Sequence, residues 1–188
     1  MTTSPLSFTV KPTLTGDLVT LRPVSTDDVP GLMEMLHDPE GNRLTGTHLS
    51  EFSRENAEKW YSTRGDQDDR LDLAVIEREG GTYVGEVVVN ELDSDNRACG
   101  FRICLIGPRA FGRGFGTEAT RLILAHAFET VGVNRIELEV YSFNPRARHV
   151  YEKVGFVLEG TKRQALRWNG EWIDADLMAM LRSDWLAR

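Results

Sequence analysis

A glycine-rich segment between a predicted strand and a predicted helix constrains the fold of this 188-residue chain most strongly. Residues 97–106 are predicted to form a strand, and residues 117–132 have the apolar periodicity of a helix. Glycines between them let backbone N–H groups approach a ligand closely, and the helix start adds partial positive charge. The segment therefore predicts a phosphate-binding site at Arg109, Gly112, Arg113, Gly114, Gly116 and Thr117.

Two better-known phosphate motifs do not match this segment. No Gly-Lys-Ser/Thr follows the glycines, so the segment is not a P-loop. Its G-x-G-x-G spacing differs from the dinucleotide fingerprint G-x-G-x-x-G, and no acidic ribose-binding residue stands at the right distance.

A second segment, residues 138–156, joins a strand to a capped helix. On the strand predicted over residues 135–142, Glu137 and Glu139 face the side opposite to the apolar positions. Asn144 is placed to cap the next helix, and Tyr151 follows two turns later. Taken alone, Tyr151 is typical of a core residue, and the two carboxylates are typical of a solvated strand face.

The remaining periodic segments predict a mixture of strands and helices. Further strands are predicted over residues 17–24, 71–78, 82–93, 156–163 and 171–181, and further helices over residues 29–38, 53–64 and, with its caps, 144–155. This pattern predicts an α/β (α+β) fold with a single domain over residues 17–188. Residues 1–16 have no period and are predicted to form a loosely attached N-terminal arm.

The charge of the chain is unevenly distributed. Residues 1–96 carry 8 Lys/Arg against 19 Asp/Glu, whereas residues 97–188 carry 14 against 10, for a net charge of −7. A net acidic chain argues against a general nucleic-acid-coating role. The asymmetry predicts two ligands of opposite sign, one cationic and one anionic.

Cysteine and histidine usage narrows the class further. Cys99 and Cys104 are too few for a disulfide framework, and on one strand they would point to opposite faces. The four histidines lack metal-ligand spacing, so no metal site is predicted. No signal peptide or membrane-length apolar run is visible, which predicts a cytoplasmic protein without a membrane partner.

In this order and about 30 residues apart, the two segments resemble the acetyl-CoA-binding core of the GNAT N-acetyltransferase superfamily. Residues 109–119 look like its Q/R-x-x-G-x-G/A loop, and residues 144–156 are similar to its N-x-x-A/S-x-x-x-Y-x-x-x-G-F segment. Residues 167–181 resemble the C-terminal strand of the RimJ/RimL-like branch, although Ala147 stands where that branch often has Ser. The resemblance implies a mixed, mostly antiparallel sheet of about seven strands. It also implies a splay between the fourth and fifth strands and about four flanking helices.

The resemblance also implies which residues bind acetyl-CoA. Its pyrophosphate would lie on the amides around Gly112, Gly114 and Gly116, with charge supplied by arginines. Its pantetheine arm would bond to the strand before the loop. The implied set adds these residues to the glycines: Ile103, Leu105, Ile106, Arg109, Arg113, Thr117, Asn144 and Arg148.

The implied reaction is direct attack of a primary amine on the thioester in a ternary complex. An alkylamine has a pKa of about 10.4, so a base must remove a proton. Glu139 is the first candidate, because its position is similar to that of a catalytic Glu in some N-terminal acetyltransferases of the family. Rival bases are Glu86, Asp174 and Asp176. Tyr151 would protonate the leaving thiolate, whose conjugate thiol has a pKa of about 8.5.

Two other functions remain open from sequence. One is a sensor that binds acyl-CoA on the same fold without turnover, and the other is a binder of nucleotide phosphates. For an enzyme, the acceptor could be a polyamine, an aminoglycoside, another small amine or a protein N-terminus. The acyl-chain preference is open, and a homodimer is possible.

Overall fold

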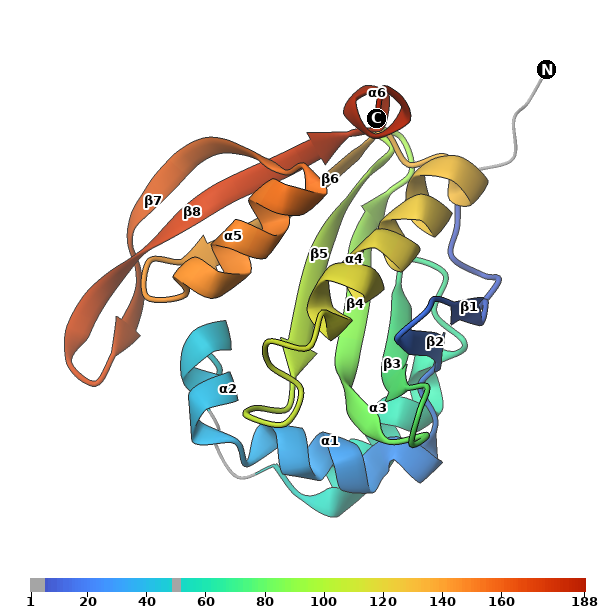
Figure 1. Cartoon of the computed structure of the whole chain (residues 1–188), viewed down its shortest axis with the longest axis vertical. Coiled ribbons are helices and arrows are strands. Elements are labelled where there is room, and N and C mark those ends of the chain that lie inside the picture. Colours follow the sequence, from blue (N-terminus) through green and yellow to red (C-terminus); the bar gives the residue numbers. More distant parts are fainter. Residues whose placement is uncertain (1–5, 49–51) are drawn as a thin grey trace.

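Eight strands form one mixed sheet in the described residues, 6–48 and 52–188, of the computed structural model (Figure 1). They are β1 (Leu14–Thr15), β2 (Val19–Pro23), β3 (Leu71–Glu77), β4 (Tyr83–Asp93), β5 (Ala98–Leu105), β6 (Arg135–Tyr141), β7 (Val157–Trp168) and β8 (Glu171–Leu181). Their order is β1-β2-β3-β4-β5-β6-β8-β7, and only β5 and β6 pair in parallel. The predicted mixed, mostly antiparallel sheet is confirmed, with β1 as an additional strand.

Six α-helices accompany the sheet within the described ranges. They are α1 (Val29–Leu36), α2 (Pro39–Thr45), α3 (Arg54–Arg64), α4 (Phe115–Ala125), α5 (Pro145–Val154) and α6 (Arg182–Leu186), and a π-helical turn, His126–Val131, extends α4. The four predicted helices correspond to α1, α3, α4 and α5. Sequence patterning missed α2 and α6 because seven and five residues are too few to show a helical period.

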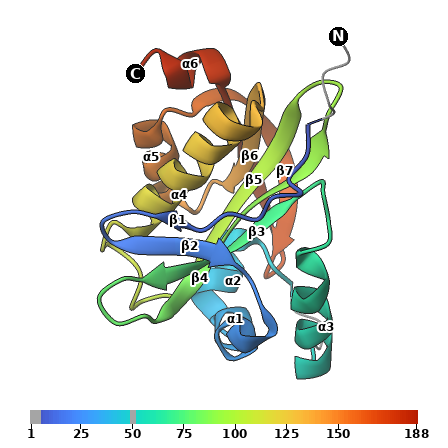
Figure 2. The same ribbon diagram turned by 90° about the vertical axis from the view of Figure 1, so that its right-hand side faces the viewer.

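Side-chain alternation on the strands separates two helical layers. On β3, Leu73 and Val75 pack in the core beneath α4, whereas Ala74 between them packs with residues of α1 and α3. Neighbouring strand residues point to opposite faces, so α1 and α3 cover one face of the sheet and α4 covers the other. Figure 2 shows α4 and α5 on one side of the strands and α3 on the other.

The sheet opens between β5 and β6. These strands pair only from Ala98–Gly100 to Arg135–Glu137, and beyond this point they diverge toward α2 (Figure 1). β6 instead pairs along its whole length with β8, so β6, β8 and β7 form a second wing of the sheet. The predicted splay is confirmed; without β1, it lies between the fourth and fifth strands.

A bulge in β4 determines the direction of Glu86. The β3–β4 register shifts at Val75/Ile76, opposite Gly85. At Gly85, φ is 152°, and an added Cβ would lie 2.1 Å from the Cys104 carbonyl oxygen, so only glycine fits. Val84 and Val87 on either side both face the core beneath α4. Glu86 therefore points to the opposite face, toward α3, where Tyr61 contacts it.

The N-terminal arm is not loosely attached over its described part, contrary to the sequence-based prediction. Phe8 is almost fully buried in the core, and its N–H donates to the Asp68 carbonyl at 2.7 Å. β1 then pairs with β2. A single buried aromatic in a segment without a period gave no sequence signal. Residues 1–5 of the predicted arm and residues 49–51 of the predicted domain lie outside the described residues.

Both cysteines lie on β5 and are free, as predicted. Cys99 packs in the core beneath α4, and Cys104 packs on the other face. None of the described helices has both the length and the apolar character needed to span a bilayer.

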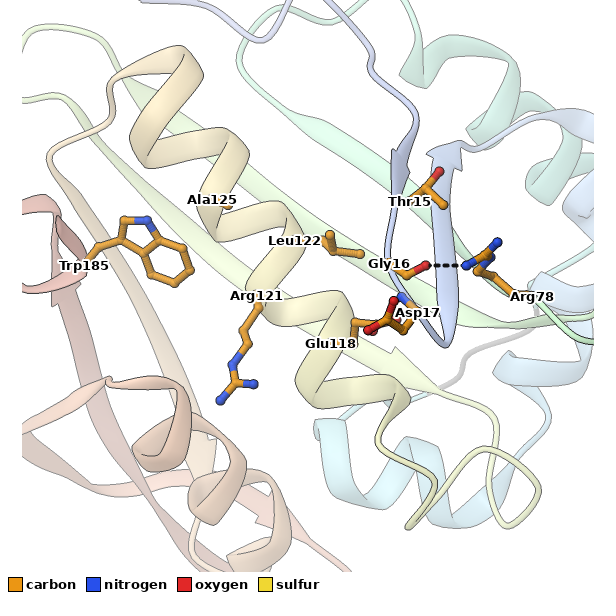
Figure 3. A pocket seen from close by; sticks show the side chains of 9 residues that line it. All are labelled: Thr15, Gly16, Asp17, Arg78, Glu118, Arg121, Leu122, Ala125 and Trp185. Carbon is orange, nitrogen blue, oxygen red and sulfur yellow. Dashed lines mark hydrogen bonds between the residues drawn. The ribbon is translucent and has the colours of Figure 1, made fainter. Parts of the chain in front are cut away.

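Glu118, in the first turn of α4, anchors the β1–β2 connection (Figure 3). Its carboxylate accepts hydrogen bonds from the backbone N–H groups of Asp17, Leu18 and Val19 at 2.9, 2.7 and 2.7 Å. The side chain therefore ties the edge of the sheet to the helix that begins at the glycine-rich loop.

Glu118→Ala is expected to lower the free energy of unfolding by about 2 kcal/mol, because three backbone donors lose a charged acceptor. Denaturant unfolding measures this change. Glu79→Ala is the matched control, since Glu79 is an exposed turn carboxylate. Equal stability of the two variants would show that the anchor contributes nothing.

Candidate active site

A cavity of about 840 Å³ passes through the sheet where β5 and β6 diverge. Residues from both faces line it: Tyr151 and Ile103 from the side of α4 and α5, and Glu86 and Cys104 from the side of α1 and α3. Most predicted site residues line this cavity: Ile103, Leu105, Gly112, Gly114, Gly116, Thr117, Glu139, Asn144 and Tyr151. Two ligands entering from opposite faces could therefore meet within it.

Unpaired amide groups line the cavity at the start of α4. In the described residues, the backbone N–H groups of residues 112–117 make no hydrogen bond to another protein group. Gly112 and Gly114 have φ values of 73° and 84°, a backbone conformation that other residues adopt only with strain. The glycines thus leave consecutive donors without a protein partner among the described residues, next to the positive end of α4.

Three predicted phosphate-binding arginines do not line the cavity. Arg109 pairs with Glu34 on α1, and Arg113 pairs with Glu77 on β3. Arg148 pairs with Asp176 and, one helical turn along α5, with Glu152. Each guanidinium therefore has an acidic partner in this structure. Ile106 also lies elsewhere, buried beside α1 and α3.

Two other cations on α5 take the place predicted for Arg148. Arg146 and Lys153 line the cavity, and the Arg146 guanidinium lies 3.7 Å from the centre of the Phe111 ring. Arg146 and Lys153 are seven residues apart and therefore share a face of α5. Arg148 and Glu152 are four residues apart, a spacing that is typical of ion pairs on a helix surface. That spacing was the available sequence signal that Arg148 pairs with Glu152.

Tyr151 is buried in α5 and packs edge-to-face against Phe101 and Phe156, with ring centroids 6.0 and 5.8 Å away. Its hydroxyl has no hydrogen-bond partner among the described residues, and Tyr151 lines the cavity. Burial raises the pKa of the phenol, which therefore remains protonated at neutral pH. The packing predicted for a core tyrosine is thus combined with a hydroxyl free to meet a ligand.

Of the four candidate bases, only Glu139 and Glu86 line the cavity. Glu139 is partly exposed on β6 and pairs with Lys162 of β7. Asp174 instead accepts the Gln164 N–H at 2.7 Å within the β7–β8 hairpin. Asp176 accepts from Thr161 at 2.7 Å in addition to its pair with Arg148.

Glu86 lies at the floor of the cavity within a buried polar network. It accepts from the Tyr61 hydroxyl at 2.9 Å and pairs with Arg102 at 3.1 Å, while the Tyr61 and Tyr83 hydroxyls lie 3.0 Å apart. Burial raises the pKa of Glu86, and the charge of Arg102 and the Tyr61 hydrogen bond offset this only in part. The network therefore holds a carboxyl group whose ionised form is disfavoured.

The raised pKa of Glu86 gives a pH-dependent stability. The native state binds this proton more tightly than the unfolded state, so its stabilising contribution is complete below the unfolded pKa. That contribution is lost as pH rises through the folded pKa.

Glu86→Gln is therefore expected to raise Tm at pH 7 to 8, with a gain that shrinks toward pH 4. Thermal unfolding across this range tests the slope, with the exposed Glu91→Gln on β4 as control. A gain that is constant with pH would contradict the expectation.

Cys104 also lines the cavity, opposite Glu86 in the β4–β5 register. Burial raises the pKa of its thiol to about 12. Because the thiolate is the nucleophile, this thiol is unsuited to form an acyl-enzyme. The arrangement favours direct transfer between two bound ligands.

The splayed sheet, the unpaired amides at the helix start and the protonated Tyr151 describe an α/β protein with one cavity that is open to ligands from both faces of its sheet. The acetyltransferase (GNAT) domain matches residues 19–157, most of the chain. The chain therefore belongs to the GNAT family of acetyltransferases and is an N-acetyltransferase.

Relatives within the family act on different amines. Spermidine N(1)-acetyltransferase of Escherichia coli is 27% identical over 169 residues, covering 90% of this chain and 89% of that one. An L-amino acid N-acetyltransferase of E. coli is 36% identical over 105 residues, covering 54% and 64%. The structure of Vibrio cholerae spermidine N-acetyltransferase in complex with CoA and spermine superposes with a TM-score of 0.83 at 24% identity, covering 91% and 99%.

Proposed function

We propose that this enzyme transfers the acetyl group of acetyl-CoA to a primary amine by direct attack in a ternary complex. The observation that carries the proposal is the continuous cavity through the splayed sheet. It joins the amide cradle and Tyr151 on one side to Glu86 and Glu139 on the other. The anionic donor and the amine can therefore approach each other from opposite faces.

The unpaired N–H groups of residues 112–117 suit the pyrophosphate of the donor, and Thr117 stands at the end of this run. Arg146 and Lys153, which form no ion pair within residues 6–48 and 52–188, supply positive charge from α5. Arg109 and Arg113 would first have to leave Glu34 and Glu77. Ile103 and Leu105 line the path of the pantetheine arm along β5, and Asn144 caps the helix that holds Tyr151.

In the proposed reaction, the amine nitrogen forms a bond to the thioester carbonyl carbon, and the carbon–sulfur bond then breaks. Glu139 removes a proton from the incoming ammonium, whose pKa of about 10.4 keeps it mostly charged at neutral pH. Lys162 must then move away from Glu139. Tyr151 donates its phenolic proton to the leaving sulfur, and the second proton lost by the nitrogen restores the phenol. The products are an amide, the free thiol of CoA and a protonated Glu139.

Several finer predictions from sequence remain proposals: the RimJ/RimL-like branch, a protein N-terminus as acceptor, a homodimer and a cytoplasmic location. Named relatives that acetylate spermidine and L-amino acids support a small amine as acceptor. The acyl donor is supported by the CoA-bound structural relative.

Two measurements on the purified chain test the proposal. Acetyl-CoA at 100 times its Kd is expected to stabilise the protein by about 2.7 kcal/mol in thermal unfolding, and ATP is expected to have no effect. Release of CoA thiol is then followed with a panel of amines. Stabilisation without thiol release from any amine would favour the sensor, and absence of stabilisation would overturn acetyl-CoA as the donor.

A further inference from the structure

Two side chains of opposite charge stand at matching positions on the two strands that border the splay. The last parallel pair between β5 and β6 is Gly100 with Glu137. Two residues further along each strand stand Arg102 and Glu139, which point to the same face of the sheet because side chains alternate. Both line the cavity. One wall of the acceptor half thus carries a cation, and the facing wall carries an anion.

Arg102 presents its charge to the cavity more fully than its partner does. The side chain of Arg102 is 52% exposed, whereas that of Glu86 is 8% exposed. Only Nη2 of Arg102 contacts Glu86, and Nε and Nη1 have no acceptor in residues 6–48 and 52–188. A guanidinium with free donors at the edge of a cavity is suited to bind a carboxylate.

The surroundings of Arg102 strengthen the positive character of this wall. Trp60, which also lines the cavity, has the Arg64 guanidinium 4.0 Å from its ring centre. Hydrogen bonds from Arg64 go to the Trp60 carbonyl and the Thr63 hydroxyl, both neutral groups. Arg70 also lies near Trp60, but it pairs with Asp72. The negative charge of Asp69, which is outside the cavity lining, acts on both Arg64 and Arg70.

We propose that the acceptor is a small amine that carries a carboxylate a few bonds from its nitrogen, as an amino acid does. Arg102 binds the carboxylate while the amine lies toward Glu139. This inference rests on the proposed transfer reaction and adds a specificity-determining residue to it. A polyamine would instead bring a second ammonium group close to Arg102 and its neighbouring arginines, which disfavours it.

Matched acceptors test the inference through thiol release. L-Phenylalanine is compared with 2-phenylethylamine and L-leucine with 3-methylbutylamine, because each pair differs only by the carboxylate; spermidine is the third type of acceptor. The wild type is expected to show a kcat/KM about 10-fold or more higher for the amino acid of a pair. Equal or better use of the decarboxylated amines or of spermidine would overturn the inference while upholding transfer to amines.

Variants of Arg102 locate the effect. Arg102→Gln is expected to lower kcat/KM for the amino acids by about 10- to 100-fold, mainly through KM, and to leave the decarboxylated amines unaffected. Arg102→Lys should restore part of the preference for the amino acids. Arg163 is an exposed cation outside the cavity lining, so Arg163→Gln should leave kcat/KM unchanged for both members of each pair. An equal loss for both members of a pair would show a merely structural role.

A binding measurement separates this inference from the proposed function. In the presence of CoA, calorimetry compares N-acetyl-L-phenylalanine with N-acetyl-2-phenylethylamine. Tighter binding of the carboxylate by the wild type, lost in Arg102→Gln, would support the inference even if no amine were turned over. Equal binding of the two compounds would overturn it, whatever the rate of transfer.

Discussion

Tyr151→Phe is expected to lower kcat by about 100-fold or more while leaving the Kd for acetyl-CoA unchanged. The ring would keep its packing against Phe101 and Phe156, so only the hydroxyl is lost. That hydroxyl lines the cavity, is protonated at neutral pH and has no protein partner in the described residues. Without it, the sulfur must leave as an unprotonated thiolate. Steady-state thiol release gives kcat, and calorimetry gives the Kd.

Tyr83→Phe is the matched control for this variant. Tyr83 is half-buried, and its hydroxyl contacts Tyr61 and does not reach the cavity lining. The Tyr83→Phe variant is therefore expected to retain the wild-type kcat. If Tyr151→Phe also kept wild-type kcat, another group or water would protonate the thiolate, and Tyr151 would have only a packing role.

Gly112→Ala is expected to weaken acetyl-CoA binding by about 10-fold or more. An alanine at a φ of 73° is strained by about 1–2 kcal/mol, and the strain is relieved by turning the local amides away from the cavity. An added Cβ meets no protein atom within 4 Å, so the folded protein itself has room for it. Since hydrogen bonds to a charged group contribute about 1.5–3 kcal/mol, misdirecting even one amide gives a loss of this size.

Gly170→Ala separates this effect from backbone strain. Gly170 has a φ of 88° in the β7–β8 turn, and a Cβ there likewise meets nothing within 4 Å. Both variants should lose similar stability in thermal unfolding, but only Gly112→Ala should bind acetyl-CoA more weakly in calorimetry. Equal affinities in the two variants would exclude the proposed role of the amide cradle.

Local features account for the parts of this protein that could be predicted from its sequence. The strand, glycine-rich loop and helix of residues 98–125 are contiguous, so spacing and glycine content were enough to place the amide cradle. The same holds for the Asn144 cap and for Tyr151 two turns later, since the Asn144 carboxamide accepts the Ala147 N–H at 3.1 Å. The alternation of side chains along β6, which is also a pattern of contiguous residues, placed Glu139 on the polar face of that strand.

Features that depend on distant residues could not be predicted in this way. The partners of Arg109 and Arg113 lie 75 and 36 residues away in sequence, so nothing local showed that these two charges were already paired. The bulge at Gly85 turns Glu86 toward α3, and the Cys104 carbonyl of the neighbouring strand leaves room there only for glycine.

By itself, the sequence determined the fold class and the positions of the glycine-rich loop and of Tyr151 on its helix, because each is specified by contiguous residues or by a regular period. Only the tertiary structure decided which charges face the cavity. Arg146 and Lys153 on one side and Arg102 opposite Glu139 on the other are brought together by the divergence of β5 and β6. Whether a charge meets a ligand or another side chain depends on packing between elements far apart in the chain, and no single segment encodes that packing.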